Sequence, residues 1–219
     1  MTTVTGIDVA GDVRPYLPQF KAAGISFVFR YYALQEDTRI PGKIISADEA
    51  QAISAAGFKL GAVFENGQPT TPEYFTSDRG RTDAAIALQC AARIAQPANT
   101  PIFFTVDGDL PYGDISTAVF NYFVGIRNAI SPAYPVGVYG SGLVCEKMTD
   151  WALAKYSWLA GAKDWAGYSD FLPRATIVQG SLPAALHGIP DFPYSDSDGD
   201  TTSAIDYGGF QVPVDVSAA

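Results

Sequence analysis

Short apolar runs alternate with helix-like stretches along the chain, and this alternation constrains the fold more than any other feature. Eight runs are predicted to be strands because they are rich in β-branched and aromatic residues and are bounded by turn-forming residues. They are TGIDVAG, SFVFRYY, KLGAVFENG, PIFFTVDGD, PVGVYGSG, YSWLAGAKDW, ATIVQG and, more weakly, SAIDYGG at residues 203–209. Strands that alternate with helices pair in parallel, so the pattern predicts a parallel sheet.

The stretches between these runs carry apolar residues at helical spacing. The clearest helix is predicted from Ser46 to Ala56, where Ser46 and Glu49 form a capping box and Gly57 supplies the C-terminal stop. Four further helices are predicted at about residues 14–23, 81–95, 114–130 and 142–155. The chain therefore repeats a strand-then-helix unit.

A chain of 219 residues allows about 27 residues for each of eight units, close to the ~30 of a TIM-type (β/α)8 barrel. No linker, repeat or charge block divides the chain, so we predict one α/β barrel domain over residues 1–219. The barrel is expected to be somewhat irregular, because residues 165–175 leave room for barely two helical turns. Its last helices should therefore be short or missing. The Pro-, Gly- and Asp-rich stretch 183–200 is predicted to be a long loop.

Composition excludes several classes of function. The 14 basic and 23 acidic residues give a net charge of −9, which would repel a nucleic acid. No apolar run approaches the ~20 residues that span a bilayer, and the N-terminus has no basic region, so we expect a soluble chain without a membrane span or visible signal peptide. We predict no cofactor and no metal site, because the one histidine, His187, cannot supply a zinc site with several imidazoles. Whether Cys90 and Cys145 pair depends on the fold.

Polar residues occupy the predicted carboxyl ends of the strands, where TIM-type barrels carry their active sites. In strand order these residues are Asp8, Arg30, Glu65, Asp107, Asp109, Tyr139, Lys163, Gln179 and Asp206. Aromatic residues near the same ends include Tyr31, Trp158 and Trp165, whose flat rings suit a sugar. The sequence therefore predicts an acidic, aromatic mouth.

Asp107 and Asp109 are two residues apart, so on a strand both side chains would leave the same face about 6–7 Å apart. Such closeness raises the pKa of one carboxyl, which leaves an acid beside an anion, as glycoside hydrolysis requires. The pair could instead bind a divalent cation, and a metal-dependent phosphodiesterase or deacetylase is one alternative. The segment DSDGD at residues 196–200 lacks the Gly and Glu of a calcium loop, so we predict a flexible acidic loop there.

Several motifs taken in order resemble a known family. They are GIDVAGDV, FVFRYY, ISADEAQAISAAGFKLGAVFENG, FFTVDGD, PVGVYGSG and WLAGAKDW. Together they are similar to the glycoside-hydrolase-like domain once labelled domain of unknown function 1906, a relative of the family 25 lysozymes. The resemblance extends to about residue 179 and implies a barrel with a carbohydrate-facing cleft.

The resemblance also implies roles for individual residues. Asp8 matches the strand-one acid of those lysozymes, Asp107-Gly-Asp109 matches their D-x-E motif, and Asp206 is the candidate for the acid that closes the barrel. Asp109 stands where they have the general-acid Glu, and it is one methylene shorter. Either Asp109 or Glu65 would then be the proton donor, and Asp107 would stabilise the positive charge.

The implied function is cleavage of an amino-sugar polymer such as peptidoglycan, with substrate contacts from Arg30, Tyr139, Trp158, Lys163, Gln179 and Asp206. The alternative is a weak or inactive barrel that binds wall polysaccharide without cutting it. In either case the expected site of action is the cell envelope, reached as a secreted protein, an effector or a phage lysin.

Overall fold

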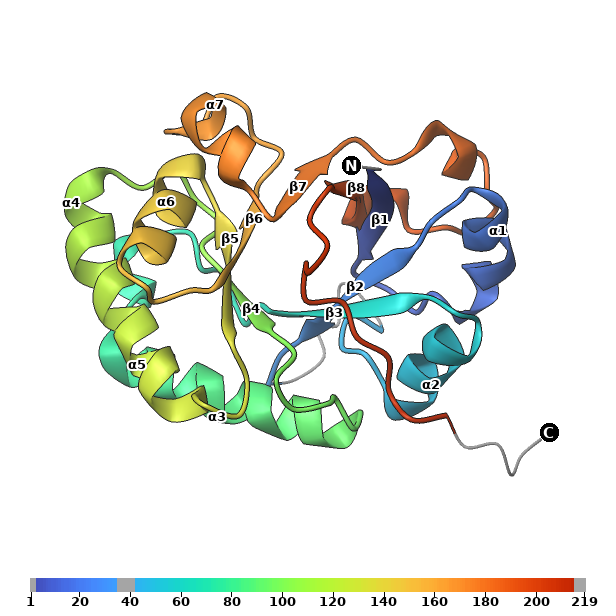
Figure 1. Ribbon diagram of the computed structural model, residues 1–219, viewed down its shortest axis with the longest axis horizontal. Coiled ribbons are helices and arrows are strands. Elements are labelled where there is room, and N and C mark those ends of the chain that lie inside the picture. The colour runs from blue at the N-terminus through green and yellow to red at the C-terminus, as the bar shows by residue number, and fades with distance from the viewer. Residues whose placement is uncertain (1–2, 35–41, 215–219) are drawn as a thin grey trace.

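The computed structural model describes residues 3–34 and 42–214. Its eight strands close into a barrel in chain order, which confirms the predicted TIM-type fold (Figure 1). The strands are β1 (Val4–Val9), β2 (Phe27–Tyr32), β3 (Lys59–Phe64), β4 (Ile102–Thr105), β5 (Val136–Gly140), β6 (Tyr156–Leu159), β7 (Ile177–Gly180) and β8 (Ser197–Thr202). The single domain predicted over residues 1–219 includes 1–2, 35–41 and 215–219, which lie outside the described residues.

The last strand differs from the expectation in place and direction. Strands β1 to β7 pair in parallel, but β8 runs antiparallel to both β7 and β1. It begins inside the stretch 183–200 predicted to be a loop and ends at Thr202, and the strand predicted at residues 203–209 is wrong. The sequence SDGDTT carries no apolar alternation, because the inward side chains of β8 are acids. Its antiparallel direction places the start of β8 at the same barrel end as the carboxyl ends of the other strands.

Mainly aromatic side chains fill the barrel interior. The interior cluster comes from alternate residues of neighbouring strands, namely the aromatic Phe27, Phe29, Phe103, Tyr156 and Trp158 and the aliphatic Val63 and Ile177. Glycines on adjacent strands leave room for the rings. Gly61 pairs directly with Phe29, and a Cβ at Gly61 would lie 2.5 Å from that ring. The same arrangement recurs where Gly6 pairs with Phe27 and Gly137 pairs with Phe103.

The predicted helices are present with shifted ends. The α-helices are α1 (Leu17–Ala22), α2 (Ala47–Ala55), α3 (Ser77–Arg93), α4 (Tyr112–Asp114), α5 (Phe120–Ile130), α6 (Gly142–Asp150) and α7 (Tyr168–Phe171). A π-helical turn, Ile115–Val119, joins α4 to α5. Ser46 caps α2 as predicted, because its hydroxyl accepts from the Glu49 amide at 3.1 Å. The Glu49 carboxylate, however, turns away from the cap to other partners described below.

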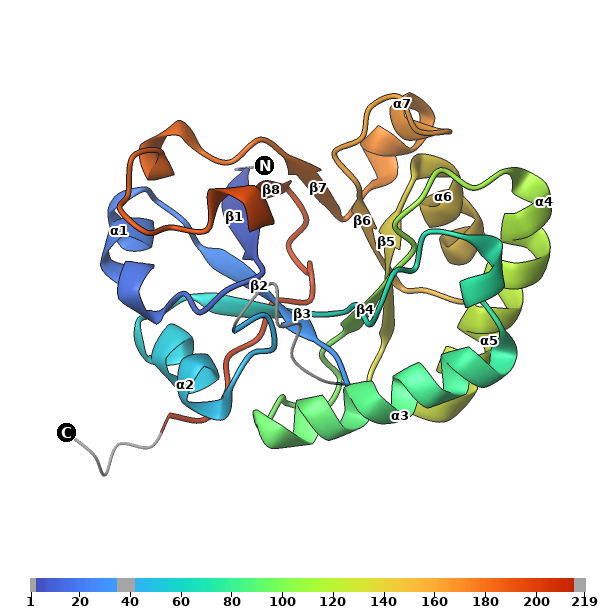
Figure 2. The same ribbon diagram turned by 180° about the vertical axis from the view of Figure 1, so that it is seen from behind.

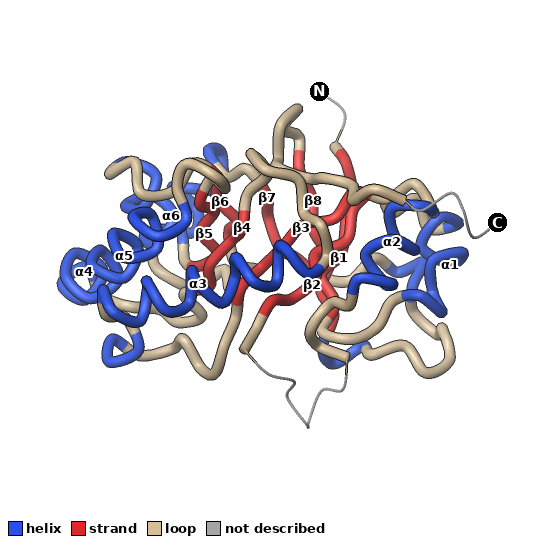
Figure 3. The backbone as a smooth tube through the Cα atoms, turned by 90° about the horizontal axis from the view of Figure 1, so that it is seen from below, coloured by secondary structure: helices blue, strands red, loops and turns tan. Residues whose placement is uncertain are grey.

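Helices cover the barrel unevenly. The helices α4, α5 and α6 lie on one side of the strands and α1 and α2 on the other, and α3 runs across the strands between these two groups (Figures 1 and 3). Only the four-residue α7 and short 3₁₀ turns follow β6 and β7 in the described chain. This confirms the prediction that the last helices are short or missing. The segment from β7 to β8 instead crosses to α1, seen from behind in Figure 2, where Tyr16 donates its hydroxyl to the carbonyl of Asp191 at 2.6 Å.

Two further expectations concern single features. Cys90 and Cys145 are both buried free thiols, so they do not pair with each other. Among the helices within the described ranges, none is both long and apolar enough to cross a membrane.

Candidate active site

A pocket of about 240 Å³ opens at the carboxyl ends of the parallel strands. We call it the acid pocket, and its lining includes Asp8, Tyr31, Lys43, Glu65, Asp107, Tyr139, Trp158, Gln179, Asp196 and Asp198. The structure therefore brings together most of the predicted strand-end residues. It adds Lys43, Asp196 and Asp198, which the sequence did not single out.

Asp8 ends the inward face of β1 and is the most deeply buried carboxylate of the acid pocket, at 2% exposure. Its Oδ1 accepts from the hydroxyl of Tyr31 at 2.9 Å, and its Oδ2 accepts from Nε2 of Gln179 at 3.2 Å. Burial raises the pKa of Asp8 to about 7, and the charges of Asp198 and Glu65 act in the same direction. Asp8 therefore changes its protonation near neutral pH.

Gln179 on β7 fixes the orientation of the surrounding groups. Its Oε1 accepts from the hydroxyl of Tyr139 at 2.9 Å and from the backbone N–H of Gly161 at 3.1 Å. With the oxygen fixed in this way, Nε2 faces two carboxylates, Asp8 at 3.2 Å and Asp198 at 3.4 Å. Gln179 is thus the neutral donor between two acids.

Strand β8 supplies two acids that sequence reasoning missed. Asp198 pairs with Asp8 in the antiparallel register, and Asp200 lies two residues deeper in the barrel. Trp158 donates its indole N–H to Oδ1 of Asp200 at 2.8 Å, and Oδ2 of Asp200 has no hydrogen-bond partner among the residues that the structure describes. Burial raises the pKa of Asp200 well above its usual range, as does the neighbouring charge of Asp8. The period-two spacing of the acids in DSDGD is the one signal that could have revealed this strand.

Glu65 and Asp107 stand in different electrostatic surroundings. Lys43 contacts Oε1 of Glu65 at 2.6 Å and lies 5.0 Å above the centre of the Tyr31 ring. Asp107 follows β4 on a loop that is tied down where its N–H donates to the carbonyl of Pro69 at 2.8 Å. Asp107 is exposed at the mouth of the pocket, but desolvation by the surrounding protein raises its pKa, and so does the charge of Glu65. Glu65 is therefore ion-paired, whereas Asp107 holds its proton more tightly than an ordinary aspartate.

Asp109 does not join this group. Strand β4 ends at Thr105, so Asp107 and Asp109 lie on a loop and the expected common face does not exist. The Asp109 side chain is exposed, and its Oδ1 accepts from the backbone N–H of Ala166 at 2.8 Å. The expectation that Asp107 and Asp109 leave one face of a strand is therefore wrong, and of the two predicted proton donors it is Glu65, not Asp109, that lines the acid pocket with Asp107.

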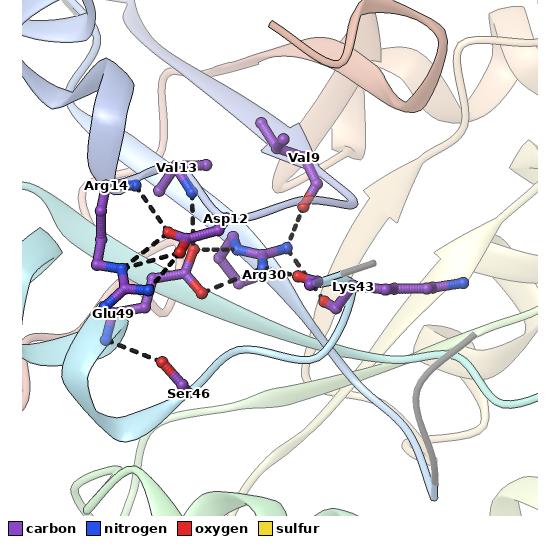
Figure 4. Close-up of polar contacts among 9 residues, drawn as sticks. Val9, Asp12, Val13, Arg14, Arg30, Lys43, Ser46 and Glu49 are labelled. Atoms are coloured by element: carbon purple, nitrogen blue, oxygen red, sulfur yellow. Dashed lines mark hydrogen bonds and ion pairs between the residues drawn. The ribbon is translucent and has the colours of Figure 1, made fainter. Parts of the chain in front are cut away.

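Arg30 lies on the outer face of β2, with its side chain fully buried between strand and helix (Figure 4). Alternation along the strand explains this, because Tyr31 faces the acid pocket and its neighbour must face away. Arg30 donates through Nε to Glu49 at 2.7 Å, and its guanidinium also binds the carbonyls of Val9 and Gly42. The prediction that Arg30 contacts substrate is wrong, and its role is structural.

Asp206 also lies elsewhere. Its carboxylate accepts from the hydroxyl of Tyr156, the first residue of β6, at 2.8 Å. That position is at the opposite end of the barrel from the acid pocket, and 66% of the Asp206 side chain is exposed. Asp206 is therefore not the acid that closes the barrel, a position that Asp198 on β8 occupies.

A second cavity of about 400 Å³ adjoins the acid pocket. We call it the lysine cavity, and its lining includes Lys163, Trp165 and Ser181 together with Asp107, Tyr139, Gln179 and Asp198. The last four residues also line the acid pocket. Trp158 forms the floor of the acid pocket, with only 1% of its surface exposed. No group of three or more His, Cys, Asp or Glu side chains in residues 3–34 and 42–214 is arranged to hold a metal ion.

Comparison with known sequences identifies relatives of this chain. The sequence model of the Rv2525c-like, glycoside hydrolase-like domain matches residues 18–189. The uncharacterized protein YbfG of Bacillus subtilis is 32% identical over 120 residues. That match covers 51% of this chain but only 16% of YbfG, so the chain spans a small part of this relative's length.

Solved structures share the barrel. The Tat-secreted protein Rv2525c of Mycobacterium tuberculosis, in complex with L-tartrate, matches with a TM-score of 0.79 and 20% identity, over 94% of this chain and 98% of that one. The modular autolysin LytC of Streptococcus pneumoniae, in complex with a synthetic peptidoglycan ligand, matches with a TM-score of 0.58 and 14% identity, over 91% of this chain and 46% of LytC. At these identities the likeness shows a common fold. It confirms the resemblance to lysozyme-like barrels that the strand-end motifs predicted.

Proposed function

Because this chain belongs to the Rv2525c-like, glycoside hydrolase-like family, we propose that it is a glycosidase that cleaves an amino-sugar polymer, with peptidoglycan as the substrate. The observation that carries the proposal is the pair formed by Asp107 and Glu65 at the mouth of the acid pocket. The surroundings of Asp107 raise its pKa, and Glu65 is ion-paired with Lys43, so the two carboxyls differ in the direction that glycoside hydrolysis needs.

Asp107 is the proton donor in this proposal, because desolvation by the pocket walls and the charge of Glu65 raise its pKa. It protonates the glycosidic oxygen as the bond to the anomeric carbon breaks. Glu65, ion-paired with Lys43, stabilises the positive charge that develops on the sugar. Water then adds to the anomeric carbon and gives a proton to the Asp107 carboxylate, which restores the acid. These roles exchange those expected from the sequence, where Asp107 was the charge stabiliser.

The remaining residues of the acid pocket orient the sugar. Tyr139 and Gln179 present a hydroxyl and an amide that are already linked at 2.9 Å, and Trp158 supplies an apolar floor. Asp8 acts on the pair through its charge, which it gains near neutral pH. A wall polymer lies outside the cytoplasmic membrane, so the proposal also places the site of action at the cell envelope.

Digestion of purified peptidoglycan tests this function, with new reducing ends and the masses of released fragments as the readout. Asp107→Asn should reduce the rate at least a hundredfold, because general acid catalysis contributes about 10²–10⁴-fold. Asp109→Asn is the matched control. It removes a nearby carboxylate that lies outside the acid pocket, and its rate should stay within about twofold of the wild type.

Equal rates for wild type and Asp107→Asn would refute the assignment. If the wild type releases no fragments but retains the intact polymer in a pull-down, the chain belongs to the class of wall-binding barrels. One observation favours this second function. Asp109, the second acid of the D-x-E-like motif, lies outside the acid pocket.

A further inference from the structure

The acid pocket and the lysine cavity are two halves of one cleft with different charges. Asp107 lines both, as do Tyr139, Gln179 and Asp198. A glycan that lies along the cleft therefore passes Asp107 at the junction. One sugar would occupy the acid pocket and its neighbour the lysine cavity.

The acid pocket disfavours an anionic sugar. Its lining includes five carboxylates, those of Asp8, Glu65, Asp107, Asp196 and Asp198. Lys43 is the one basic side chain among the described lining residues, and it is ion-paired with Glu65 at 2.6 Å. A carboxylate placed here would meet like charges at close range, which is unfavourable at low local dielectric.

The lysine cavity contains an exposed basic side chain, which the lining of the acid pocket lacks. Lys163 is exposed at its wall, and it forms no ion pair with any residue that the structure describes. Trp165 lines the same cavity, and its backbone is held where its N–H donates to the carbonyl of Ala162 at 3.0 Å. An aromatic ring beside a cation suits a sugar ring that carries a negative substituent.

We propose that the lysine cavity is the subsite for a sugar bearing a carboxylate, with Lys163 as the specificity-determining residue. A neutral sugar occupies the acid pocket, and the linkage between the two lies at Asp107. In a polymer that alternates neutral and anionic sugars, this arrangement selects one of the two kinds of linkage. The inference rests on the proposed function, since it requires a glycan in the acid pocket.

The test uses two ligands that differ only in charge. The first is a peptide-free strand of alternating N-acetylglucosamine and N-acetylmuramic acid with free lactyl carboxylates. The second is the same strand after its carboxylates are converted to methylamides. Dissociation constants are measured by calorimetry with the full chain carrying Asp107→Asn, so that neither strand is cut.

Lys163→Gln should weaken binding of the carboxylate strand about fivefold, as expected for loss of one partly exposed ion pair, and leave the methylamide strand unchanged. Lys59→Gln is the control, because Lys59 is an exposed lysine at the start of β3, at the other end of the barrel. It should change neither affinity.

Equal effects of Lys163→Gln on both strands, or no effect on either, would overturn the subsite. If neither strand binds even before Lys163 is changed, the proposed function itself fails and this inference with it. The two failures are therefore distinguishable.

Discussion

Gln179 donates from Nε2 to Oδ2 of Asp8 at 3.2 Å, a contact between residues 171 positions apart in the chain. Strand β8 lies between their strands, and its Asp198 accepts from the same amide nitrogen at 3.4 Å. The side chain of Gln179 thus places a neutral donor where two carboxylates meet. The strands that close the barrel therefore also bring together the charged groups of the acid pocket.

Gln179→Glu should destabilise the protein in a pH-dependent way. The change removes the donor and adds a third carboxylate beside Asp8 and Asp198, so the free energy of unfolding at pH 7 should fall by about 2 kcal/mol. The new carboxyl would have a raised pKa in the folded state, so the loss should shrink as pH falls. Urea unfolding at pH 5 and pH 7 measures both effects. Gln51→Glu on the exposed face of α2 should show neither.

Asp8→Asn should flatten the pH dependence of stability. The pKa of Asp8 is about 7 when folded, against 3.8 for the unfolded chain, so the folded protein binds the proton more tightly. The stability that this proton contributes is complete below about pH 4 and is lost as pH rises through about 7, a difference of up to about 4 kcal/mol. Urea unfolding from pH 4 to 7 should therefore show a smaller slope for Asp8→Asn. An unchanged slope would contradict the raised pKa, and Asp48→Asn on the exposed start of α2 provides the comparison.

Arg30 and Glu49 should matter for stability rather than for glycan binding. Both side chains are almost completely buried, so Arg30→Met or Glu49→Gln alone leaves an unpaired charge and should cost about 3–5 kcal/mol. The double variant should recover part of that loss, which a double-mutant cycle by urea unfolding measures. Variants that remain folded should bind the glycan with wild-type affinity. A selective loss of affinity without loss of stability would return Arg30 to the substrate site.

Gly61→Ala should disturb the barrel interior. The added methyl group would lie 2.5 Å from the Phe29 ring, which packs against Trp158 with ring centres 4.5 Å apart. Overpacking of this kind typically costs about 1–3 kcal/mol, seen as a lower urea midpoint with an unchanged slope. Gly24→Ala meets no atom within 4 Å, although its positive φ adds backbone strain. The loss of stability in Gly24→Ala therefore measures backbone strain without steric crowding, and it serves as the comparison for Gly61→Ala.

The candidate site was predictable where it depends on parallel strands. Asp8, Glu65, Tyr139 and Gln179 each follow or end an apolar run, and in a parallel barrel those ends meet at one mouth. Asp109 and Arg30 were misplaced for local reasons that the sequence did not show. Strand β4 ends at Thr105, four residues before the end of its motif, so Asp109 lies on a loop, and the alternation set by Tyr31 turns Arg30 outward.

The sequence by itself determined the order of strands and helices and the start of α2, because apolar spacing and helix caps depend on neighbouring residues. Only the tertiary structure decided how the barrel closes. Strand β8 has no apolar signature, and its place depends on pairing with β1, whose residues lie more than 180 positions earlier in the chain. That pairing brings the exposed Asp198 beside the buried Asp8, and burial together with the charge of Asp198 raises the pKa of Asp8 to about 7.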